Sequence, residues 1–406
     1  MKVLKIKEHK KFELKEDRET LQSLSLDFSC EKQEVKFLKL DPNFETSYFI
    51  GLDWLIPNQC ALMVYPKIEN LDYLQMFMTC FNNPEICEDL KKIYKIKFGE
   101  PPINLETNPF ELTPLIVFHF LNVVKDIVKK GLKKDYIRIE DNLQSKVKGK
   151  IVFSKSLKLN NFKGRTDRSY CNYQEYSVDC FENRLLKKAL VFVRLYLNKH
   201  FKQNTELLYT LNYVFSAFAD VSDEIDYYKI KNLKINALYK EYGEGLRLAQ
   251  MVLKKFSYSL TETNEKESKE IPPFYIDMSL LFELYVYSKL KQEFGNQISY
   301  QSKGKYGNTD FLKIDEKLII DSKYKPKYTE KDFYDIENIR QLSGYARDKG
   351  IAKKLKIENT TTIVDCVIIY PNNDSKIDFN GRSLKEEEIH QFIQFHKCGI
   401  KLPLKK

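Results

Sequence analysis

Apolar residues in the first hundred positions occur in short runs separated by turn residues. Three runs have the length and composition of β-strands: Glu34 to Leu40, Ser47 to Leu52 and Cys60 to Tyr65. The next run, Leu71 to Cys80, has helical spacing. We therefore predict a β-rich N-terminal domain over residues 1–111.

Beyond residue 111 the apolar positions recur at the spacing of amphipathic helices. Helices are predicted at Leu112 to Leu132, Cys180 to His200, Leu207 to Phe218 and Tyr242 to Tyr258. A basic, poorly periodic segment separates the first two. Residues 112–270 are predicted to form a mainly helical middle region, which ends in a charged linker, Thr261 to Glu270, before Pro272 and Pro273.

Helical and strand patterns alternate in residues 271–406, which predicts a compact α/β domain. The expected order is helix, two strands, helix, strand and helix, at Met278 to Phe294, Thr309 to Lys323, Asp335 to Lys349, Thr361 to Tyr370 and Leu384 to Phe395. The whole chain is thus expected to be an α+β multidomain protein.

Composition narrows the class of protein. The chain has 406 residues, 43% of them hydrophobic and 31% charged, as in globular proteins of more than one domain. Its net charge of +10 moderately favours polyanionic partners. The eight cysteines include no CxxC pair, which indicates buried thiols in a reducing compartment. We see no secretory signal or membrane span and expect a cytoplasmic protein.

The segment Thr309 to Lys323 has the pattern of two strands joined by a tight turn at Asp315 and Glu316. With a loop of two or four residues Phe311 faces Ile320, and Asp310 faces Asp321. Directly opposed side chains are roughly 4.5 to 5.5 Å apart at Cβ, and like charges there are destabilising. Strand alternation adds Lys323 to the same face and turns Ser322 away.

A divalent cation would offset this repulsion. The sequence has five histidines and no HExxH motif, so an oxygen-bound metal is expected instead of zinc. Mg²⁺ or Mn²⁺ held by Asp310 and Asp321 suits phosphodiester hydrolysis, with Lys323 orienting water or stabilising the transition state. The alternative is an exposed strand with alternating charge, because a DxK tripeptide is common by chance. The apolar run Leu318 to Ile320 favours a buried strand.

Two predicted helices add candidates for the same site. Glu283 is the single acid in the otherwise mainly apolar stretch Met278 to Leu290 and is a candidate third metal ligand. Gln341 and Tyr345 are four residues apart, so they share a helix face and are candidates for steering substrate or water. Ordinary helix packing is the alternative explanation for all three residues.

A basic stretch precedes several tyrosines in the middle region. Cationic side chains of this kind can neutralise the phosphates of DNA, and aromatic rings can stack on bases. A solvated charged face is the alternative interpretation. The candidate DNA-binding residues are Lys148, Lys150, Lys155, Lys158, Arg165 and Arg168.

Several stretches together resemble the McrC family, the nuclease components of McrBC-like and LlaJI-like restriction systems. In chain order they are Val64-Tyr-Pro-Lys-Ile68, Gly149-Lys-Ile151, Tyr176-Ser-Val-Asp179, Glu182-Asn-Arg-Leu-Leu-Lys187, Leu281-Phe-Glu283, Asp310 with Asp321-Ser-Lys-Tyr-Lys325, and Gln341 to Tyr345. One departure is Thr309, where the family motif name implies proline.

The resemblance implies a PD-(D/E)xK nuclease domain with a central mixed sheet. It also implies a Mg²⁺-dependent DNA endonuclease that docks on a hexameric AAA+ GTPase through its N-terminal and middle regions, stimulates that partner and cuts double-stranded DNA. No GxxxxGK[ST] motif occurs in the sequence, so the nucleotide site is expected on the partner. Double-strand cutting implies transient dimerisation.

Two other functions remain open at this point. One is a free-standing PD-(D/E)xK nuclease of DNA repair or of a helicase complex. The other is an adaptor without catalytic activity that activates an NTPase or holds DNA. Intact Asp310, Asp321 and Lys323 argue against the adaptor.

Overall fold

The chain forms two compact units in the computed structural model. The structure describes residues 1–24, 26–28, 35–80, 83, 86, 89, 92–97, 99–105, 113–200, 205–225, 240–260, 269–305, 307–358 and 361–405. One unit combines Met1–Phe110 with Glu267–Lys406, and the other is Glu111–Lys266. This division differs from the predicted three domains because residues 1–111 and 271–406 share one unit.

A five-stranded sheet contains most N-terminal strands. Its order is β1 (Lys2–Lys7), β3 (Cys60–Tyr65), β2 (Phe49–Ile56), β10 (Phe274–Asp277) and β4 (Tyr94–Ile96), with β1 and β3 parallel and the other pairs antiparallel. Helices α1 (Lys15–Ser23) and α2 (Tyr73–Cys80) and the two-stranded pair β5 (Ile103–Leu105) and β9 (Lys269–Ile271) complete the segment.

Two predictions for this part of the chain were wrong. The run Glu34 to Leu40 contains no strand in its described part; Phe37–Lys39 is a 3-10 helix with positive φ at each residue, a backbone that a strand cannot adopt. The boundary near residue 271 was misplaced as well, because β10 pairs with β2 and β4. The predicted linker Thr261 to Glu270 lies outside the described residues up to position 268.

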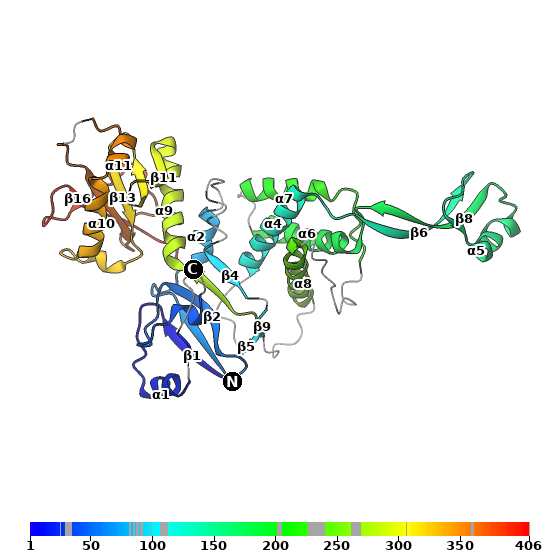
Figure 1. Cartoon of the computed structure of the whole chain (residues 1–406), viewed down its shortest axis with the longest axis horizontal. Coiled ribbons are helices and arrows are strands. Elements are labelled where there is room, and N and C mark those ends of the chain that lie inside the picture. Colours follow the sequence, from blue (N-terminus) through cyan, green and yellow to red (C-terminus); the bar gives the residue numbers. More distant parts are fainter. Residues whose placement is uncertain are drawn as a thin grey trace. The chain divides into compact units, whose positions relative to one another are not determined.

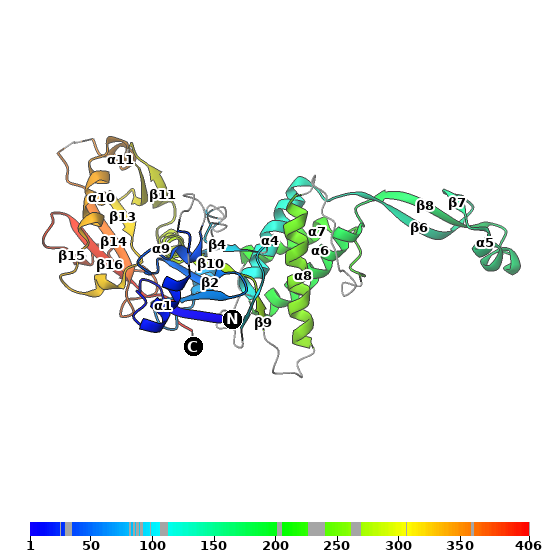
Figure 2. The same cartoon turned by 60° about the horizontal axis from the view of Figure 1, so that its bottom comes forward.

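The second unit has a helical body and a long β-hairpin (Figures 1 and 2). The body consists of α4 (Thr113–Lys130), α6 (Phe181–His200), α7 (Thr205–Ala217) and α8 (Lys240–Leu260), close to the predicted helices. Strands β6 (Asp135–Gln144) and β8 (Arg168–Ser177) extend from it and end in β7 (Lys150–Ile151), α5 (Phe153–Leu159) and a 3-10 turn, Asn161–Lys163. The poorly periodic segment is therefore an extended hairpin, which the prediction of a mainly helical region missed.

A six-stranded mixed sheet forms the C-terminal part of the first unit. Its order is β11 (Ile298–Lys303), β12 (Asn308–Lys313), β13 (Leu318–Ser322), β14 (Asp365–Pro371), β16 (Phe395–Ile400) and β15 (Glu387–Glu388). β13, β14 and β16 are parallel and the remaining pairs are antiparallel. The predicted helix Leu384 to Phe395 was wrong, because this segment contributes β15 and the start of β16.

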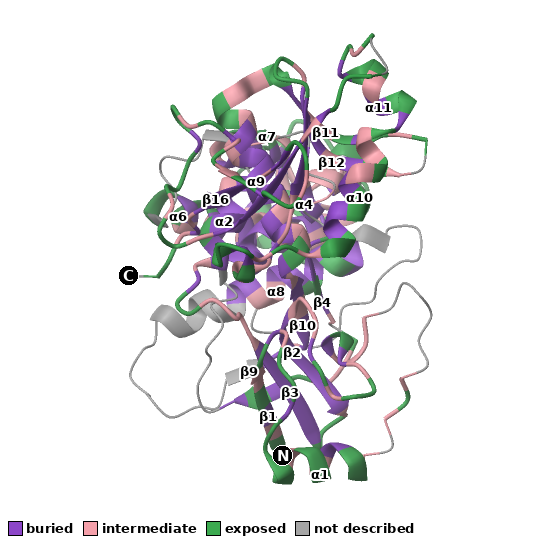
Figure 3. Ribbon diagram, turned by 90° about the vertical axis from the view of Figure 1, so that its left-hand side faces the viewer, coloured by how far each residue is buried: buried purple, intermediate pink, exposed green. Residues whose placement is uncertain are grey.

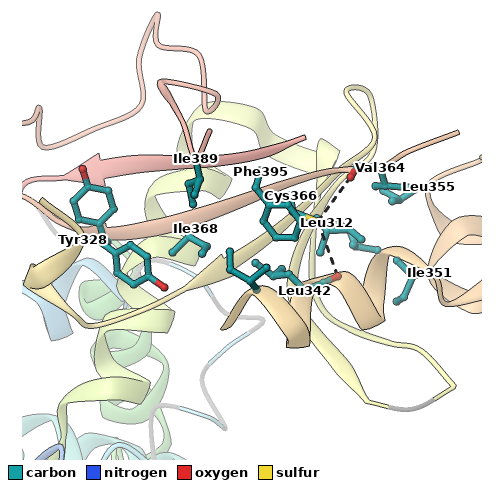
Figure 4. Packing of buried hydrophobic residues seen from close by; sticks show 13 residues of the cluster. Leu312, Tyr328, Leu342, Ile351, Leu355, Val364, Cys366, Ile368, Ile389 and Phe395 are labelled. Carbon is teal, nitrogen blue, oxygen red and sulfur yellow. Dashed lines mark hydrogen bonds between the residues drawn. The ribbon is translucent and has the colours of Figure 1, made fainter. Parts of the chain in front are cut away.

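Helices pack on this mixed sheet. α10 (Ile336–Ala346) and α11 (Lys349–Lys354) contribute to a buried cluster with β12, β13 and β14, in which Leu312, Ile319 and Ile368 pack against Leu342 and Ile351 (Figure 4). α9 (Met278–Phe294) contacts β11 and β13, and its Tyr287 ring stacks on Phe311. Buried residues follow the strands of both large sheets (Figure 3). The ends of β12 and β13 are thereby held on a fixed framework.

Six cysteines lie in the described residues, and all six are free and buried: Cys60, Cys80, Cys171, Cys180, Cys366 and Cys398. This confirms the expected buried thiols for those positions, whereas Cys30 and Cys87 lie outside the described residues. No described helix is long and apolar enough to cross a membrane.

The tip of the hairpin depends on Gly149, which has a φ of 64°. A Cβ there would lie 2.6 Å from the carbonyl oxygen of Asn172 on β8. We expect Gly149→Ala to disrupt pairing of β7 with β8, at a cost of about 1–3 kcal/mol in local stability. Hydrogen exchange of the amides of Lys150 and Ile151 measures this loss.

Gly164→Ala is the matched control for this prediction. Gly164 has a similar φ of 67°, but a Cβ there would meet nothing within 4 Å. The control has the backbone strain without the clash and should leave the β7 amides much better protected. Equal protection in both variants would contradict the role of the close contact.

Candidate active site

The two adjoining strands β12 and β13 have the predicted register. Phe311 pairs with Ile320 and Leu312 with Ile319, and Ile314 to Lys317 form the connecting turn. The same register places Asp310 opposite Asp321 at the open end of the hairpin. This register results from the four-residue loop, which is one of the two loop lengths that the sequence analysis required for it.

Asp321 is the most deeply buried acid of the site, at 1% exposure. Lys323 Nζ lies 2.7 Å from its Oδ2, so the predicted neighbourhood of lysine and carboxylate is present. The other carboxylate oxygen, Oδ1, is buried and receives no hydrogen bond from a described donor. Such a group is costly in a protein interior unless a cation completes its surroundings.

Asp310 is held by the residue between Asp321 and Lys323. The backbone N–H and the hydroxyl of Ser322 donate to Asp310 Oδ2 at 2.8 and 2.9 Å. The expectation that Ser322 points away from the site was therefore wrong, because the strand ends at Ser322 and its hydroxyl reaches across to Asp310. Ser322 fixes one oxygen of the first carboxylate.

Glu283 lies on α9 within electrostatic reach of Asp310 and Asp321. Its Oε1 accepts a hydrogen bond of 3.4 Å from Gln301 Nε2. In the described part of the chain, no three His, Cys, Asp or Glu side chains stand close enough together to form a ready-made metal site. Glu283 is thus near the aspartate pair without joining it as a third ligand in this conformation.

The three acids disfavour one another's charge. Burial, reinforced by Asp310, raises the pKa of Asp321 to about 7. Burial and the same neighbour raise the pKa of Glu283 to about 7. Burial also raises the pKa of Asp310, although the Ser322 donors and Lys323 oppose the shift. The site therefore concentrates negative charge that positive charge must balance.

Lys323 stays cationic in this setting. Burial disfavours its charged form, but the carboxylates of Asp321 and Asp310 outweigh burial and raise the pKa of Lys323 above its usual value. A protonated ammonium donates hydrogen bonds and cannot accept a proton. Lys323 is consequently suited to stabilising negative charge and not to acting as a general base.

The α10 candidates connect directly to Lys323. Lys323 Nζ donates to Gln341 Oε1 at 3.3 Å, and Gln341 Nε2 donates to the Tyr345 hydroxyl at 3.2 Å. A polar chain thus runs from Asp321 through Lys323 to the exposed face of α10. The structure brings together Asp310, Asp321, Lys323, Gln341 and Tyr345, with Glu283 beside them.

The residues present fit a hard divalent cation. Mg²⁺ and Mn²⁺ prefer carboxylate oxygens and keep several waters, so two aspartates and open coordination positions suffice. The buried Oδ1 of Asp321, which has no donor among the described residues, is the observation that favours such an ion. Asp310 has one oxygen occupied by Ser322, which leaves the other available.

The basic candidates lie in the other compact unit, at the end of the β6–β8 hairpin. Lys148, Lys150, Lys155, Lys158 and Arg165 are exposed, and Arg168 is half-buried. Lys155 pairs with Glu140 and lies 4.9 Å from the Tyr170 ring centroid, and Lys148 lies 5.1 Å from that of Tyr173. Two of the candidate cations, Lys148 and Lys155, therefore lie beside tyrosines that follow the basic stretch in the sequence.

Comparison with known families decides the relationship. The model of the McrBC 5-methylcytosine restriction system component family matches residues 55–354, which is most of the chain. This chain belongs to the McrBC family. The matched range includes every stretch on which the McrC resemblance rested, from Val64 to Tyr345.

Two solved assemblies from Thermococcus gammatolerans are distantly similar to this McrBC family member. One is a half-complex of McrB AAA+ hexamers with bound McrC, at 14% identity, a TM-score of 0.38, and coverage of 98% of this chain and 94% of that chain. The other is the McrBC complex, at 12% identity, a TM-score of 0.30, and coverage of 71% and 87%. A search of curated proteins found no match.

Two residues of this McrBC site escaped the sequence analysis. Ser322 donates to Asp310, and Gln301, on β11 with an unusual φ of 41°, donates to Glu283. A sequence signal existed for Ser322, since it lies inside the DxK tripeptide. No local pattern pointed to Gln301, whose place depends on the pairing of β11.

We expect Asp321→Asn to stabilise the metal-free protein at pH 8 by about 1–3 kcal/mol, the scale of an unsatisfied buried polar group. The neutral amide removes the repulsion with Asp310. Urea denaturation with EDTA present measures the free energy of unfolding.

The control is the same substitution at Asp53, a buried acid of the N-terminal sheet. Both Asp53 oxygens accept from Lys97 Nζ, at 2.8 and 2.9 Å, so Asp53→Asn should destabilise the protein. Stability losses in both variants would show that Asp321 is well compensated without a cation.

Proposed function

We propose that this McrBC family member is the DNA endonuclease subunit of a GTP-dependent restriction system and hydrolyses phosphodiester bonds with Mg²⁺ or Mn²⁺. The observation that carries the proposal is the pair Asp310 and Asp321 on adjoining strands, with Lys323 Nζ at 2.7 Å from Asp321 Oδ2 and no donor for Asp321 Oδ1 among the described residues. Family membership supports DNA as the substrate, because the family's system restricts 5-methylcytosine DNA.

The side chains have separate tasks in this proposal. Asp310 and Asp321 hold the cation, and Ser322 keeps Asp310 oriented. When bound, Mg²⁺ supplies Lewis acidity that offsets the negative charge that develops on the scissile phosphate. Lys323 donates to the same developing charge as a fixed ammonium.

The remaining candidates support this arrangement. Gln341 orients Lys323 through its Oε1, and Tyr345 orients Gln341. Glu283 adds negative potential that favours cation entry. The exposed cations of the β6–β8 hairpin are proposed to contact the DNA backbone.

The proposed partner is a hexameric AAA+ GTPase. The Thermococcus gammatolerans assemblies hold McrB AAA+ hexamers with bound McrC, and we propose the same kind of docking here, with stimulation of the partner's GTP hydrolysis. A subunit with one nuclease site makes a double-strand break only if two copies act together. Transient dimerisation through the assembled complex is therefore part of the proposal.

The test is cleavage of long methylated and unmethylated DNA with Mg²⁺, with and without the candidate GTPase and GTP. We expect cutting by the wild type to need the partner and GTP. We expect Asp321→Ala to reduce it by more than the roughly 10–100-fold typical of residues that only orient a metal ligand. Gel analysis of nicked and linear products gives the rate and shows whether one strand or both are cut.

Asp365→Ala is the matched control. Asp365 also lies on the mixed sheet, but it pairs with Leu318 at the opposite end of β13, and its carboxylate contacts Lys385. This variant should cut at the wild-type rate. Cutting without the partner would indicate a free-standing nuclease, and unchanged cutting by Asp321→Ala would reject the proposed site.

A further inference from the structure

A buried polar network connects the N-terminal sheet to the residues that follow Asp321. Glu8 follows β1 and Lys67 follows β3, and the parallel pairing of these strands brings the two residues together. The backbone N–H of Lys67 donates to Glu8 Oε1 at 2.9 Å, and the N–H of Glu8 donates to the Tyr65 carbonyl at 2.9 Å. The N-terminal sheet therefore presents a fixed carboxylate and ammonium at one edge.

Tyr324 closes this network from the other side. Lys67 Nζ donates to the backbone carbonyl of Tyr324 at 2.6 Å and lies 3.8 Å from the centroid of its ring. The Tyr324 hydroxyl donates to Glu8 Oε1 at 3.0 Å. Glu8 is 0% and Tyr324 2% exposed, so the hydrogen bond between them is shielded from water, and the Lys67 contacts are partly buried.

The network fixes the chain just after β13, where pairing within the mixed sheet ends. β13 ends at Ser322, and Lys323 keeps one backbone bond to the sheet, from its N–H to the Ile369 carbonyl at 2.8 Å. Lys67 fixes the carbonyl of the peptide bond between Tyr324 and Lys325. The N–H of that same peptide, on Lys325, donates back to the Lys323 carbonyl at 2.6 Å, so the anchored peptide is bonded directly to the backbone of Lys323.

Tyr324 also contacts the helix that carries Glu283. Its ring lies 5.6 Å from that of Phe282, the residue before Glu283 on α9. The first strand before α9, β10, belongs to the N-terminal sheet, and the N–H of Met278 donates to the Tyr48 carbonyl at 3.0 Å. The segment that follows Asp321 and the helix that carries Glu283 are therefore both anchored to the same sheet.

Stability alone does not explain a buried charged group of this kind. Burial raises the pKa of Glu8 to about 7 against the effect of Lys67, and burial lowers the pKa of Lys67 to about 8 against the effect of Glu8. A buried ion pair stabilises a fold little compared with apolar packing. What it provides is a single geometry, and here the geometry is that of the segment that carries Lys323.

We infer that Lys67, held by Glu8, is a positioning residue for the candidate active site: its ammonium fixes the Tyr324 peptide and so directs Lys323 toward Asp321. This inference rests on the proposed nuclease function and adds a role for the N-terminal sheet. It also assigns a task to the Val64-Tyr-Pro-Lys-Ile68 stretch, which the catalytic residues leave unexplained.

The test compares Lys67→Met, Lys67→Arg and Tyr324→Phe with the wild type in the assembled cleavage reaction and in Mn²⁺ binding by the free chain. Lys67→Met keeps the aliphatic stem but loses the donor, so kcat should fall about 10–100-fold with KM for DNA unchanged. Mn²⁺ binding should weaken about tenfold. Lys67→Arg should restore most of the rate, and Tyr324→Phe, which keeps the ring and carbonyl, should show a smaller loss.

Lys97→Met is the control. Lys97 pairs with the buried Asp53 on the same sheet, so its loss also leaves a buried acid unpaired, yet it does not contact the segment after β13. Folded Lys97→Met should keep the wild-type kcat and Mn²⁺ affinity, with thermal unfolding recorded for every variant.

The outcomes separate this inference from the proposed function. If the wild type cuts and Lys67→Met matches it in kcat and Mn²⁺ affinity, the positioning role is overturned and the nuclease stands. If the wild type does not cut but Lys67→Met weakens Mn²⁺ binding, the positioning role stands and the nuclease proposal fails. If Lys67→Met and Lys97→Met lose activity and Mn²⁺ affinity equally, or if the wild type neither cuts nor binds Mn²⁺, the inference is overturned.

Discussion

The repulsion between two buried carboxylates is the constraint around which the first unit is organised. Asp310 and Asp321 face one another on adjoining strands, and Asp321 is almost completely enclosed. An arrangement of this kind persists only when surrounding structure over-determines it. The mixed sheet, α9 and the buried cluster beneath α10 and α11 provide that rigidity. Their dense apolar packing resists a separation of β12 from β13, which would reduce the repulsion between the two carboxylates.

Lys323 and Ser322 offset only part of the negative charge of Asp310 and Asp321. Lys323 supplies one positive charge beside Asp321 Oδ2 and the Ser322 donors satisfy one oxygen of Asp310, yet Asp321 Oδ1 lacks a donor among the described residues. A complete set of protein partners would leave no place for a cation. The partners of the two carboxylates are sufficient for the site to form, but one oxygen is left for a divalent cation. Such a compromise between stability and function is common at functional sites.

The sequence predicted best what local geometry controls. The β12–β13 register followed from loop length and strand alternation, and the pairing of Gln341 with Tyr345 followed from helical spacing. It predicted poorly what depends on distant pairing. β10 reads as the start of a C-terminal domain, but its partners are β2 and β4, more than 170 residues earlier in the chain. The hairpin of β6 and β8 was missed because its exposed strands lack an apolar face, and periodicity reports burial rather than conformation.

Contacts between distant parts of the chain also explain why two of the short family motifs are informative only in combination. Val64 to Ile68 and Asp321 to Lys325 are far apart in the sequence, and neither is informative alone. In the folded chain Lys67 of the first donates to the carbonyl of Tyr324 in the second. Because Lys67 contacts both the carbonyl and the ring of Tyr324, a change in either stretch alters the surroundings of the other. The family relationship therefore has a physical counterpart in the packing of the N-terminal sheet against the segment that carries Lys323.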